Sequence, residues 1–324
     1  MNSGNTEQPG YQELESKLNL LGAKRKRSFI IAAVCLALAV VLPLGGIIIA
    51  AVPAVIAAVI FANLGWSAGR EMKQAAKSSV VRDALAEVFE GIAYNPNGCI
   101  DEKRVKDTGL IDEWDESLGI HVDFDYTGND HVIGKYKGRE IEMCDAKVDK
   151  VTMEIEKDDE GKETERKNRE TLFKGIWMIC KLAKPLPAAL RIREKADRAV
   201  LSPLKKIAGK RVPAKSDVET ENHAFNEQFQ ILTNDAHNAF YVLTPHFMEH
   251  ILSADNKAAG RTMLCFSGDQ VHIAIHNGRD FFEIKNGSDT KDIAALKLRI
   301  QGEIKYLTGI LDELFRNERL FKGE

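Results

Sequence analysis

The residues with the clearest potential for chemistry are acidic side chains between positions 123 and 130. Asp123 and Asp125 are followed by Gly128, which is the spacing of an EF-hand calcium loop counted from Asp123. The twelfth position of such a loop needs a bidentate glutamate, and here it is Gly134. The flanking residues alternate as in strands. We therefore expect no EF-hand, and Asp123, Asp125 and Asp130 stay as candidate polar groups for a cleft.

A second candidate is a pair of histidines, His246 and His250, four residues apart where a helix is expected. This spacing places both imidazoles on one helix face, as in zinc sites. The pattern lacks the glutamate beside the first histidine that zinc proteases use as a base. His272 and His276 share one face of a predicted strand and would add ligands only if the fold brought them near. The sequence thus predicts no metal site.

Other catalytic motifs are missing. The sequence has no Walker loop, no Gly-x-Gly-x-x-Gly and no Gly-x-Ser-x-Gly. Its five cysteines contain no Cys-x-x-Cys pair, which favours a reducing compartment over a disulfide scaffold. Cys265 lies in an apolar strand and is expected to be inert packing. We predict no cofactor and no catalytic residue, and these observations favour a protein that is not an enzyme.

The stretch that determines where the rest of the chain lies runs from Ser28 to Gly69. It contains no Asp, Glu, Lys or Arg. A membrane-spanning helix needs roughly 20 apolar residues, so this stretch is long enough to cross twice. Pro43 followed by Gly45-Gly46 predicts a tight reversal, giving segments 28–44 and 47–66. The alternatives are a single span with one long buried helix, a cleaved signal peptide and a buried soluble hairpin. The late start and the length of the apolar run argue against a signal peptide.

Basic residues flank this stretch and predict its orientation. Lys24, Arg25, Lys26 and Arg27 precede it and Arg70 follows it, whereas the connecting turn is uncharged. By the positive-inside rule, both chain ends should lie in the cytoplasm, so we expect a multi-pass protein of the inner membrane. The predicted spans contain no Asp, Glu, Lys, Arg or His, which argues against a channel or transporter.

We expect four regions along the 324 residues. Residues 1–27 form an N-terminal segment with an amphipathic helix at 11–21 and a basic flank. Residues 28–66 form the transmembrane helical hairpin, and residues 67–93 continue it as a helical stalk. Residues 94–324 form a cytoplasmic α+β domain, with a mostly antiparallel sheet and a long C-terminal helix.

Within the last region, alternation of apolar and polar residues predicts strands. The expected strands are 120–126, 131–136, 139–143, 151–155, 172–182, 225–232, 261–266, 271–276 and 281–284. Gly128-Asn129-Asp130 should break the first from the second, and Lys137-Gly138 should join the second to the third. The charged run 162–170 is expected to be a solvated loop, and Gly268-Asp269 the turn of a hairpin.

Helices are predicted at three places in the same region. Residues 102–107 form a short helix, and Thr244-Pro245 opens another that ends near Ser253, with threonine as N-cap and proline at the first position. The last helix begins at Ser288 or Asp289 and reaches Phe315. Its apolar seam recurs every three or four residues: Ile293, Leu296, Ile300, Ile304, Leu307, Leu311 and Leu314.

Function is less constrained than location. The leading hypothesis is a membrane-anchored binding or scaffold module whose partners are the lipid bilayer and proteins or further copies of itself. One alternative is a membrane-associated enzyme with its aspartates or histidines in one polar cleft. The other is an anionic-lipid-sensing domain that uses the basic run 191–215. A net charge of −3 gives no general attraction to nucleic acid.

Several motifs recur in the order and spacing of a known family. They are Tyr94-Asn95-Pro96, Asp125-Tyr126-x-Gly128-x-Asp130-x-Val132-x-Gly134 with Gly138, residues 229–241 leading into Leu243-Thr244-Pro245, and Phe266 with Val271-His272-Ile273-Ala274-Ile275 and Phe281-Phe282-Glu283. In these the chain resembles bacterial membrane proteins grouped as domain of unknown function 3137. Residues 150–215 depart from the pattern. The resemblance implies an inner-membrane protein with a cytoplasmic domain. It brings no site residue, because the family has no established activity.

Overall fold

The computed structural model describes residues 9–45, 49, 51–111, 122–157, 163–195, 217–285, 289 and 292–321. The chain divides into two compact units. The first unit contains Met1–Glu87 and Phe282–Gln301, and the second contains Val88–Phe281 and Gly302–Glu324. The helix α9 (Ile293–Phe315) runs from the first unit into the second.

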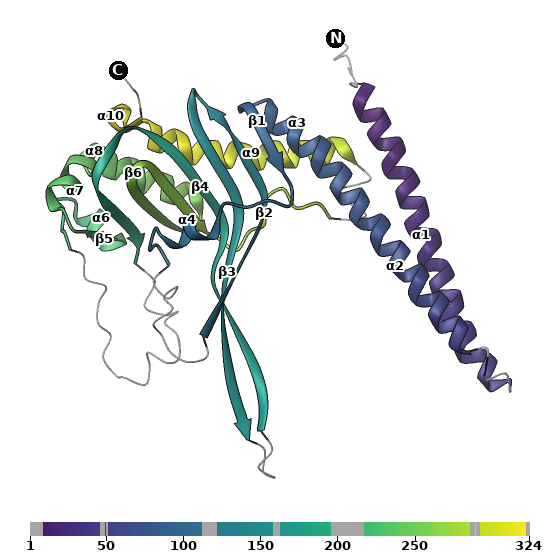
Figure 1. Ribbon diagram of the computed structural model, residues 1–324. Helices are drawn as coiled ribbons and strands as arrows, with labels where there is room; N and C mark the ends of the chain where they lie inside the picture. The colour runs from purple at the N-terminus through teal and green to yellow at the C-terminus, as the bar shows by residue number, and fades with distance from the viewer. Residues whose placement is uncertain are drawn as a thin grey trace. The chain divides into compact units, whose positions relative to one another are not determined.

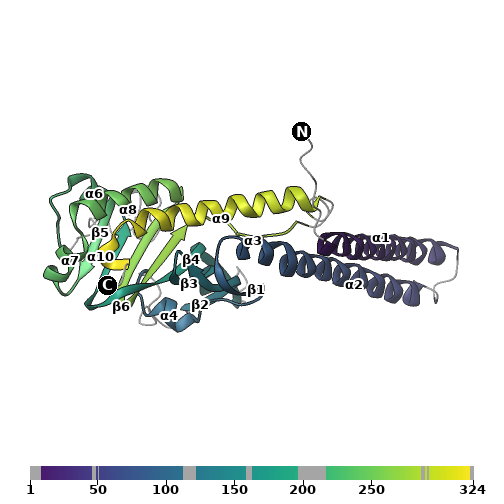
Figure 2. The same ribbon diagram turned by 90° about the horizontal axis from the view of Figure 1, so that it is seen from above.

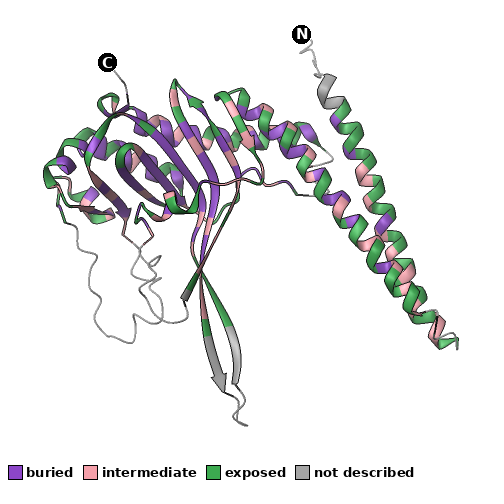
Figure 3. Ribbon diagram, viewed as in Figure 1, coloured by how far each residue is buried: buried purple, intermediate pink, exposed green. Residues whose placement is uncertain are grey.

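The first unit is built on two long helices, α1 (Pro9–Leu44) and α2 (Ala51–Ala76), which lie side by side (Figure 1). Both are long and apolar enough to cross a membrane, and only 17% of the most apolar window of each is buried. Figure 3 shows the exposed residues along both helices. The amphipathic segment and the basic flank belong to the continuous helix α1, and Pro43 lies in its last turn.

The helix continues beyond α2. A π-helical turn, η2 (Lys77–Val81), leads directly into α3 (Arg82–Ala86). Met72, Ala76, Val80 and Ala84 are all buried along this path, which matches the helical spacing in the sequence. The helical segment ends at Ala86, and Gly91 lies in the strand that follows.

The second unit contains a six-stranded antiparallel sheet, and the sequence-based prediction of an antiparallel α+β fold is confirmed. Its strands are β1 (Glu90–Asn95), β2 (Val122–Tyr136), β3 (Arg139–Lys157), β4 (Glu163–Glu194), β5 (Phe229–Thr233) and β6 (Arg261–His276). The order is β1-β2-β3-β4-β5, and β6 also pairs with β4. The far ends of β3 and β4 extend from the sheet as a two-stranded ribbon (Figure 1).

Three predicted interruptions of strands are wrong. Gly128-Asn129-Asp130 does not end a strand, because β2 absorbs the irregularity as a bulge between Asn129 and Val132. The charged run 162–170 is strand β4 from Glu163 onward, paired with β3 in a ribbon that needs no apolar face. Gly268 does not turn a hairpin, because β6 pairs with β4 on both sides of it.

Short helices surround the sheet: α4 (Glu102–Lys106), α6 (His223–Gln228), α7 (Ala236–Val242), α8 (Pro245–Ala258) and α10 (Glu318–Phe321). The Thr244 hydroxyl accepts a hydrogen bond from the Phe247 N–H, so the predicted cap of α8 is confirmed. The predicted strand 225–232 is wrong in its first half, where Asn222 caps the helix α6. The predicted strand 281–284 is also wrong, since this segment is a turn without sheet pairing.

The part of the sheet outside the β3–β4 ribbon is covered on both faces. One face packs against α4 around Trp177, Phe173, Cys144 and Ile100, all with at most 1% of their surface exposed. The other face is covered by α8 and the second-unit part of α9 (Figure 2). Residues alternate between the faces, so Asp145 on β3 points away from the core that contains Cys144.

Gly175 marks the closest approach of two strands, and its substitution should be costly. Its φ is +155°, and a Cβ added there would lie 2.0 Å from the carbonyl oxygen of Ile275. We expect Gly175→Ala to lower the free energy of unfolding by roughly 3 kcal/mol, from backbone strain and overpacking together. Chemical denaturation measures the change. Gly302→Ala, at a position with open space for a Cβ, is the control and should leave stability unchanged or raised.

Candidate functional site

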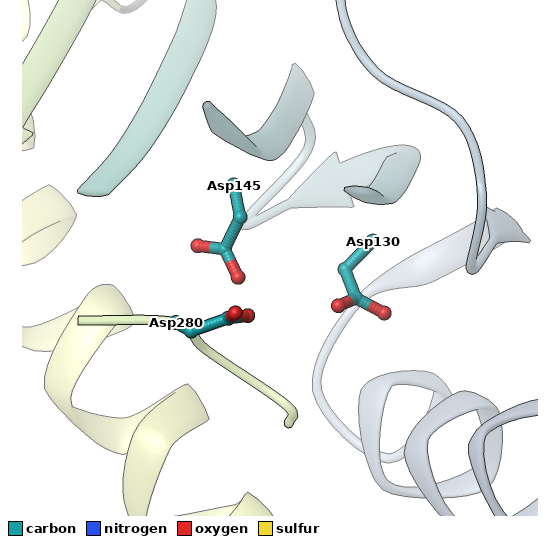
Figure 4. Close-up of side chains that lie close together, drawn as sticks. All are labelled: Asp130, Asp145 and Asp280. Atoms are coloured by element: carbon teal, nitrogen blue, oxygen red, sulfur yellow. The ribbon is translucent and has the colours of Figure 1, made fainter. Parts of the chain in front are cut away.

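Three aspartates of the second unit converge in space although they are far apart in sequence. Asp130, Asp145 and Asp280 each offer a carboxylate oxygen, and these oxygens lie within 4.8 Å of one another. Figure 4 shows the carboxylates of Asp145 and Asp280 directed toward each other, with that of Asp130 beside them. We call this group the aspartate cluster.

The bulge in β2 brings Asp130 into the cluster. Asn129 lies opposite Asp145 on β3, so in a regular strand the next residue would point to the opposite face. The extra residue of a bulge re-aims a side chain, and Asp130 adopts a left-handed φ of 57°. The Tyr94 hydroxyl donates to Asp130 Oδ1, and Asn129 Nδ2 donates to Oδ2 at 2.7 Å. These hydrogen bonds orient a carboxylate that is only 1% exposed.

Asp145 is the buried centre of the cluster, with 5% of its surface exposed. Its Oδ2 accepts a hydrogen bond from the Phe281 N–H at 2.6 Å. Its Oδ1 is buried and receives no hydrogen bond from the described residues. Burial raises the pKa of the Asp145 carboxyl well above its ordinary value, and the negative charges of Asp280 and Asp130 raise it further.

Asp280 gives the cluster its exposed side. It lies in the segment after β6, which is fastened to α9: the Phe281 ring stacks on Tyr306 with centroids 5.6 Å apart, and Asn277 Nδ2 donates to the Tyr306 hydroxyl. Asp280 itself is exposed. An ion from solvent would therefore reach the buried carboxylates past Asp280.

The cluster has two chemical options. Buried carboxylates so close together cannot all be ionised without a compensating charge. Asp145 can hold a proton shared with Asp280, or a cation can occupy the space between the oxygens. Oxygen-only ligands suit hard ions such as Ca²⁺, Mg²⁺ and Mn²⁺.

The other aspartates named from the sequence lie elsewhere. Asp123 is exposed and accepts a hydrogen bond from the Phe124 N–H, and Asp125 pairs with Arg169 at 2.7 Å. Arg169 also bridges to Asp149. Burial raises the pKa of Asp149, but hydrogen bonds from Lys147, Thr171 and Arg169 outweigh it and hold the value at about 2. This group is an ion-pair network on the sheet, so of the three candidate aspartates only Asp130 joins the cluster.

His246 and His250 do lie on one face of α8, with ring centroids 4.7 Å apart. His246 is exposed and faces Glu249, whereas His250 is buried and lies 4.0 Å from Glu313. Burial lowers the pKa of His250, and the neighbouring His246 lowers it further. Among the described residues, the aspartate cluster is the sole group of three or more side chains that fits a metal ion, so this pair lacks a third ligand.

His272 is buried in β6, and His276 is half-buried at the end of the same strand. Trp177 Nε1 donates to His272 Nδ1 at 3.1 Å, and the Lys174 N–H donates to His276 Nδ1 at 3.0 Å. The Nδ1 atom of each imidazole accepts a hydrogen bond, so both rings are neutral. Burial lowers the pKa of each to about 4.

This pair should make the fold sensitive to acid. An unfolded histidine takes up a proton near pH 6.5, whereas the folded one resists until about pH 4, so stability is complete above pH 6.5 and falls as the pH drops toward 4. For His272 the loss is roughly 3 kcal/mol. Unfolding measured at pH 7 and pH 4.5 should show this loss, and His272→Gln should reduce the difference. His223→Gln, at an exposed histidine outside both histidine pairs, should leave the difference as it is.

The basic run 191–215 is described as far as Lys195. Arg191 Nε donates to the Thr108 carbonyl at 2.5 Å, Arg193 is buried, and Lys195 donates to the Asn226 carbonyl. Residues 196–216 lie outside the described part of the chain. These internal bonds leave the anionic-lipid hypothesis with no support from the described basic residues.

Two surface grooves lie in the second unit, of about 550 and 310 Å³. The larger is lined by charged side chains that include Arg104 and Glu142, and the smaller by Tyr241 and Pro187. None of the five candidate aspartates and histidines lines either groove. Neither of these two grooves therefore supplies the shared polar cleft that the enzyme hypothesis needs.

The basic residues beside the apolar stretch lie within the two long helices. Lys24, Arg25, Lys26 and Arg27 form one turn of α1, with the Arg25 guanidinium 5.8 Å from the Phe29 ring centroid. Arg70 is exposed on α2. The four basic residues precede the apolar part of α1, and Arg70 follows the apolar part of α2, as the sequence indicates.

Sequence reasoning missed Asp145 and Asp280. Neither belongs to a motif with Asp130, and their meeting depends on the β2–β3 register and on the path of the chain after β6. The one local signal was Asp130 itself, an aspartate after Gly128-Asn129 in a strand that otherwise alternates regularly.

Comparison with known families gives one match. Residues 171–316 match the family described as "Protein of unknown function (DUF3137)". The segment includes the quoted motifs from residue 229 onward, whereas Tyr94 and the motif from Asp125 to Gly138 lie outside it. No curated protein and no solved structure matches the chain.

Proposed function

We propose that this chain, whose residues 171–316 belong to the DUF3137 family, is a membrane-anchored binding module with a divalent cation at the aspartate cluster. The family description names no activity, so the proposal depends on the chain's own residues. The observation that carries it is Asp145 Oδ1, a buried carboxylate oxygen that lies inside a group of three carboxylates and has no hydrogen-bond donor among the described residues.

The membrane part of the proposal comes from the two apolar helices of the first unit. We infer that α1 and α2 cross the inner membrane as a hairpin, which makes the protein multi-pass. The four basic residues 24–27 and Arg70 then remain on the cytoplasmic side, together with both chain ends and the second unit. The exposed apolar surface of the two helices supports this, because water would leave that surface unfavourably solvated.

The ligand set of the cluster favours calcium over magnesium. Ca²⁺ accepts about six to eight oxygen ligands in a flexible geometry, whereas Mg²⁺ needs a near-ideal octahedron and is usually held by only one or two carboxylates. The cluster offers three carboxylates whose oxygens lie within 4.8 Å of one another, so it suits Ca²⁺ better than Mg²⁺. Three carboxylates leave room for water molecules and carbonyl groups to complete the coordination of a calcium ion.

Calcium titration of the full-length protein in detergent tests the cation site. We expect saturable heat of binding for wild type and at least a tenfold weaker affinity for Asp280→Asn, whose exposed side chain supports no core. Asp269→Asn, at another exposed aspartate, is the matched control and should bind as wild type does. Equal binding by Asp280→Asn and wild type, or no binding by wild type, would refute the site.

A reporter fused after residue 321 tests the orientation. We expect a reporter that is active only in the cytoplasm to function and one that needs export to stay inactive. The opposite result would place the second unit outside the cell and overturn the proposed topology, while leaving the cation site to the titration.

A further inference from the structure

A pair of cysteines lies on the other face of β3 from the aspartate cluster. Cys99 follows β1, and Cys144 lies on β3 directly before Asp145. Both thiols are free, and their Sγ atoms are 2.7 Å apart. A disulfide needs the sulfurs at about 2.05 Å, so a small movement of either side chain is sufficient to bond them.

The backbone leaves space for this pair at one position. A Cβ added to Gly128 on β2 would lie 2.1 Å from Cys99 Sγ and 2.4 Å from the Asp145 carbonyl oxygen. Any other residue at position 128 would clash with the Cys99 side chain and the Asp145 carbonyl group where they now lie. The glycine therefore permits the contact between the two sulfurs.

Polar groups contact both sulfurs of the pair. The Tyr126 hydroxyl lies 3.0 Å from Cys99 Sγ, and the Ile100 N–H donates to Cys144 Sγ at 3.3 Å.

The two thiols differ in their exposure to solvent. Cys99 is partly exposed, and Cys144 is fully buried. An oxidant from solvent reaches Cys99 first, and the nearest sulfur for the next step is that of Cys144. Cys180 and Cys265 are both buried, so an oxidant from solvent does not reach them directly.

We propose that Cys99 and Cys144 are a reversible thiol–disulfide pair, with Cys99 as the attacking thiol and Cys144 as the resolving thiol. The co-reactant is a low-molecular-weight disulfide. The Cys99 thiolate attacks one of its sulfurs, forms a mixed disulfide and expels a small thiolate, which takes up the proton that Cys99 released. Cys144 then attacks Cys99 Sγ and expels the second small thiolate, which takes up the Cys144 proton. Two protein thiols are oxidised, and one small disulfide is reduced to two small thiols.

The test exposes full-length protein in detergent to oxidised glutathione, blocks the remaining thiols by alkylation and maps the peptides by mass spectrometry. We expect a peptide pair linked through Cys99 and Cys144, and its loss on addition of dithiothreitol. In Cys144→Ser, Cys99 should carry glutathione as a stable mixed disulfide. Cys265→Ser is the matched control and should form the Cys99–Cys144 link as wild type does.

Two results would overturn the proposal. One is wild-type protein in which Cys99 and Cys144 both stay free for alkylation after the incubation. The other is wild-type protein in which Cys99 retains glutathione while Cys144 stays reduced. The peptide map of the wild-type protein tests the proposal even if a variant fails to fold. Its result does not depend on cation binding.

Discussion

Asp145→Asn should abolish the stabilisation of the full-length protein by Ca²⁺. A ligand that binds the folded state at a concentration a hundredfold above its Kd raises the free energy of unfolding by about 2.7 kcal/mol. Asparagine at position 145 keeps the size of the side chain but removes the buried charge that a cation would neutralise. Thermal unfolding in detergent, with Ca²⁺ and with a chelator, should show a calcium-dependent shift for wild type and none for the variant.

In the absence of a cation, Asp145→Asn should not lower the stability of the protein. Because the pKa of Asp145 is raised in the folded state, its contribution to stability is full below the unfolded value near 4 and is lost as the pH rises. At pH 7 with chelator, the variant should therefore be at least as stable as wild type. Asp255→Asn is the matched control, since Asp255 is also buried with a raised pKa but lies outside the cluster. A calcium-dependent shift that survives Asp145→Asn would contradict the prediction.

Arginine in the middle of both apolar helices should prevent membrane insertion. Leu36 on α1 and Ile56 on α2 are more than half exposed, at 57% and 55%, so substitution disturbs little packing. Moving from an aliphatic residue to arginine at the centre of a span costs about 3 kcal/mol, or about 6 kcal/mol for the pair. The double variant Leu36→Arg/Ile56→Arg should be lost from the membrane fraction after alkaline extraction, while wild type is retained.

The matched control for this experiment is Leu298→Arg. Leu298 is 70% exposed on α9 and lies outside the two apolar helices, so its substitution should leave membrane retention unchanged. If the double variant stays in the membrane like wild type, the two helices do not act as spans.

Local signals in the sequence predicted much of the fold. The Thr244-Pro245 cap, the turn at Lys137-Gly138 and the end of α1 at Leu44 need only neighbouring residues, and each forms as expected. Both turn residues, Lys137 and Gly138, have left-handed φ angles, of 51° and 75°, which suit a two-residue hairpin turn. The helix α4 also follows from its cap, because Asp101 accepts hydrogen bonds from Lys103 and Arg104.

The strands were harder to predict because their ends depend on partners. The charged residues after Glu163 read as a loop because they lack the apolar alternation by which strands are predicted, yet they pair with β3 as part of β4. Phe225 read as part of a strand, but a cap from Asn222 closes a helical turn there. Gly268 read as a hairpin turn, but β4 is long enough to pair with both halves of β6.

The aspartate cluster needed the tertiary fold. Asp130 stood out in the sequence because it interrupts an alternating strand. Asp145 and Asp280 did not, because nothing local distinguishes one aspartate in a charged strand from another. The cysteine pair was missed for the same reason: Cys99 and Cys144 are 45 residues apart and meet only through the bulged strand β2.

The pairing of β6 with the middle of β4 sets an order on biosynthesis. The central strand leaves the ribosome with β3 as its neighbour, but its other edge stays unpaired until residues 261–276 have been made. Contacts of such long sequence separation form slowly, and an unpaired apolar edge is prone to aggregate. In the proposed topology, the first two helices hold the nascent chain at a bilayer during this interval. The tether would then keep the unpaired edge of the sheet apart from other chains until β6 has been made.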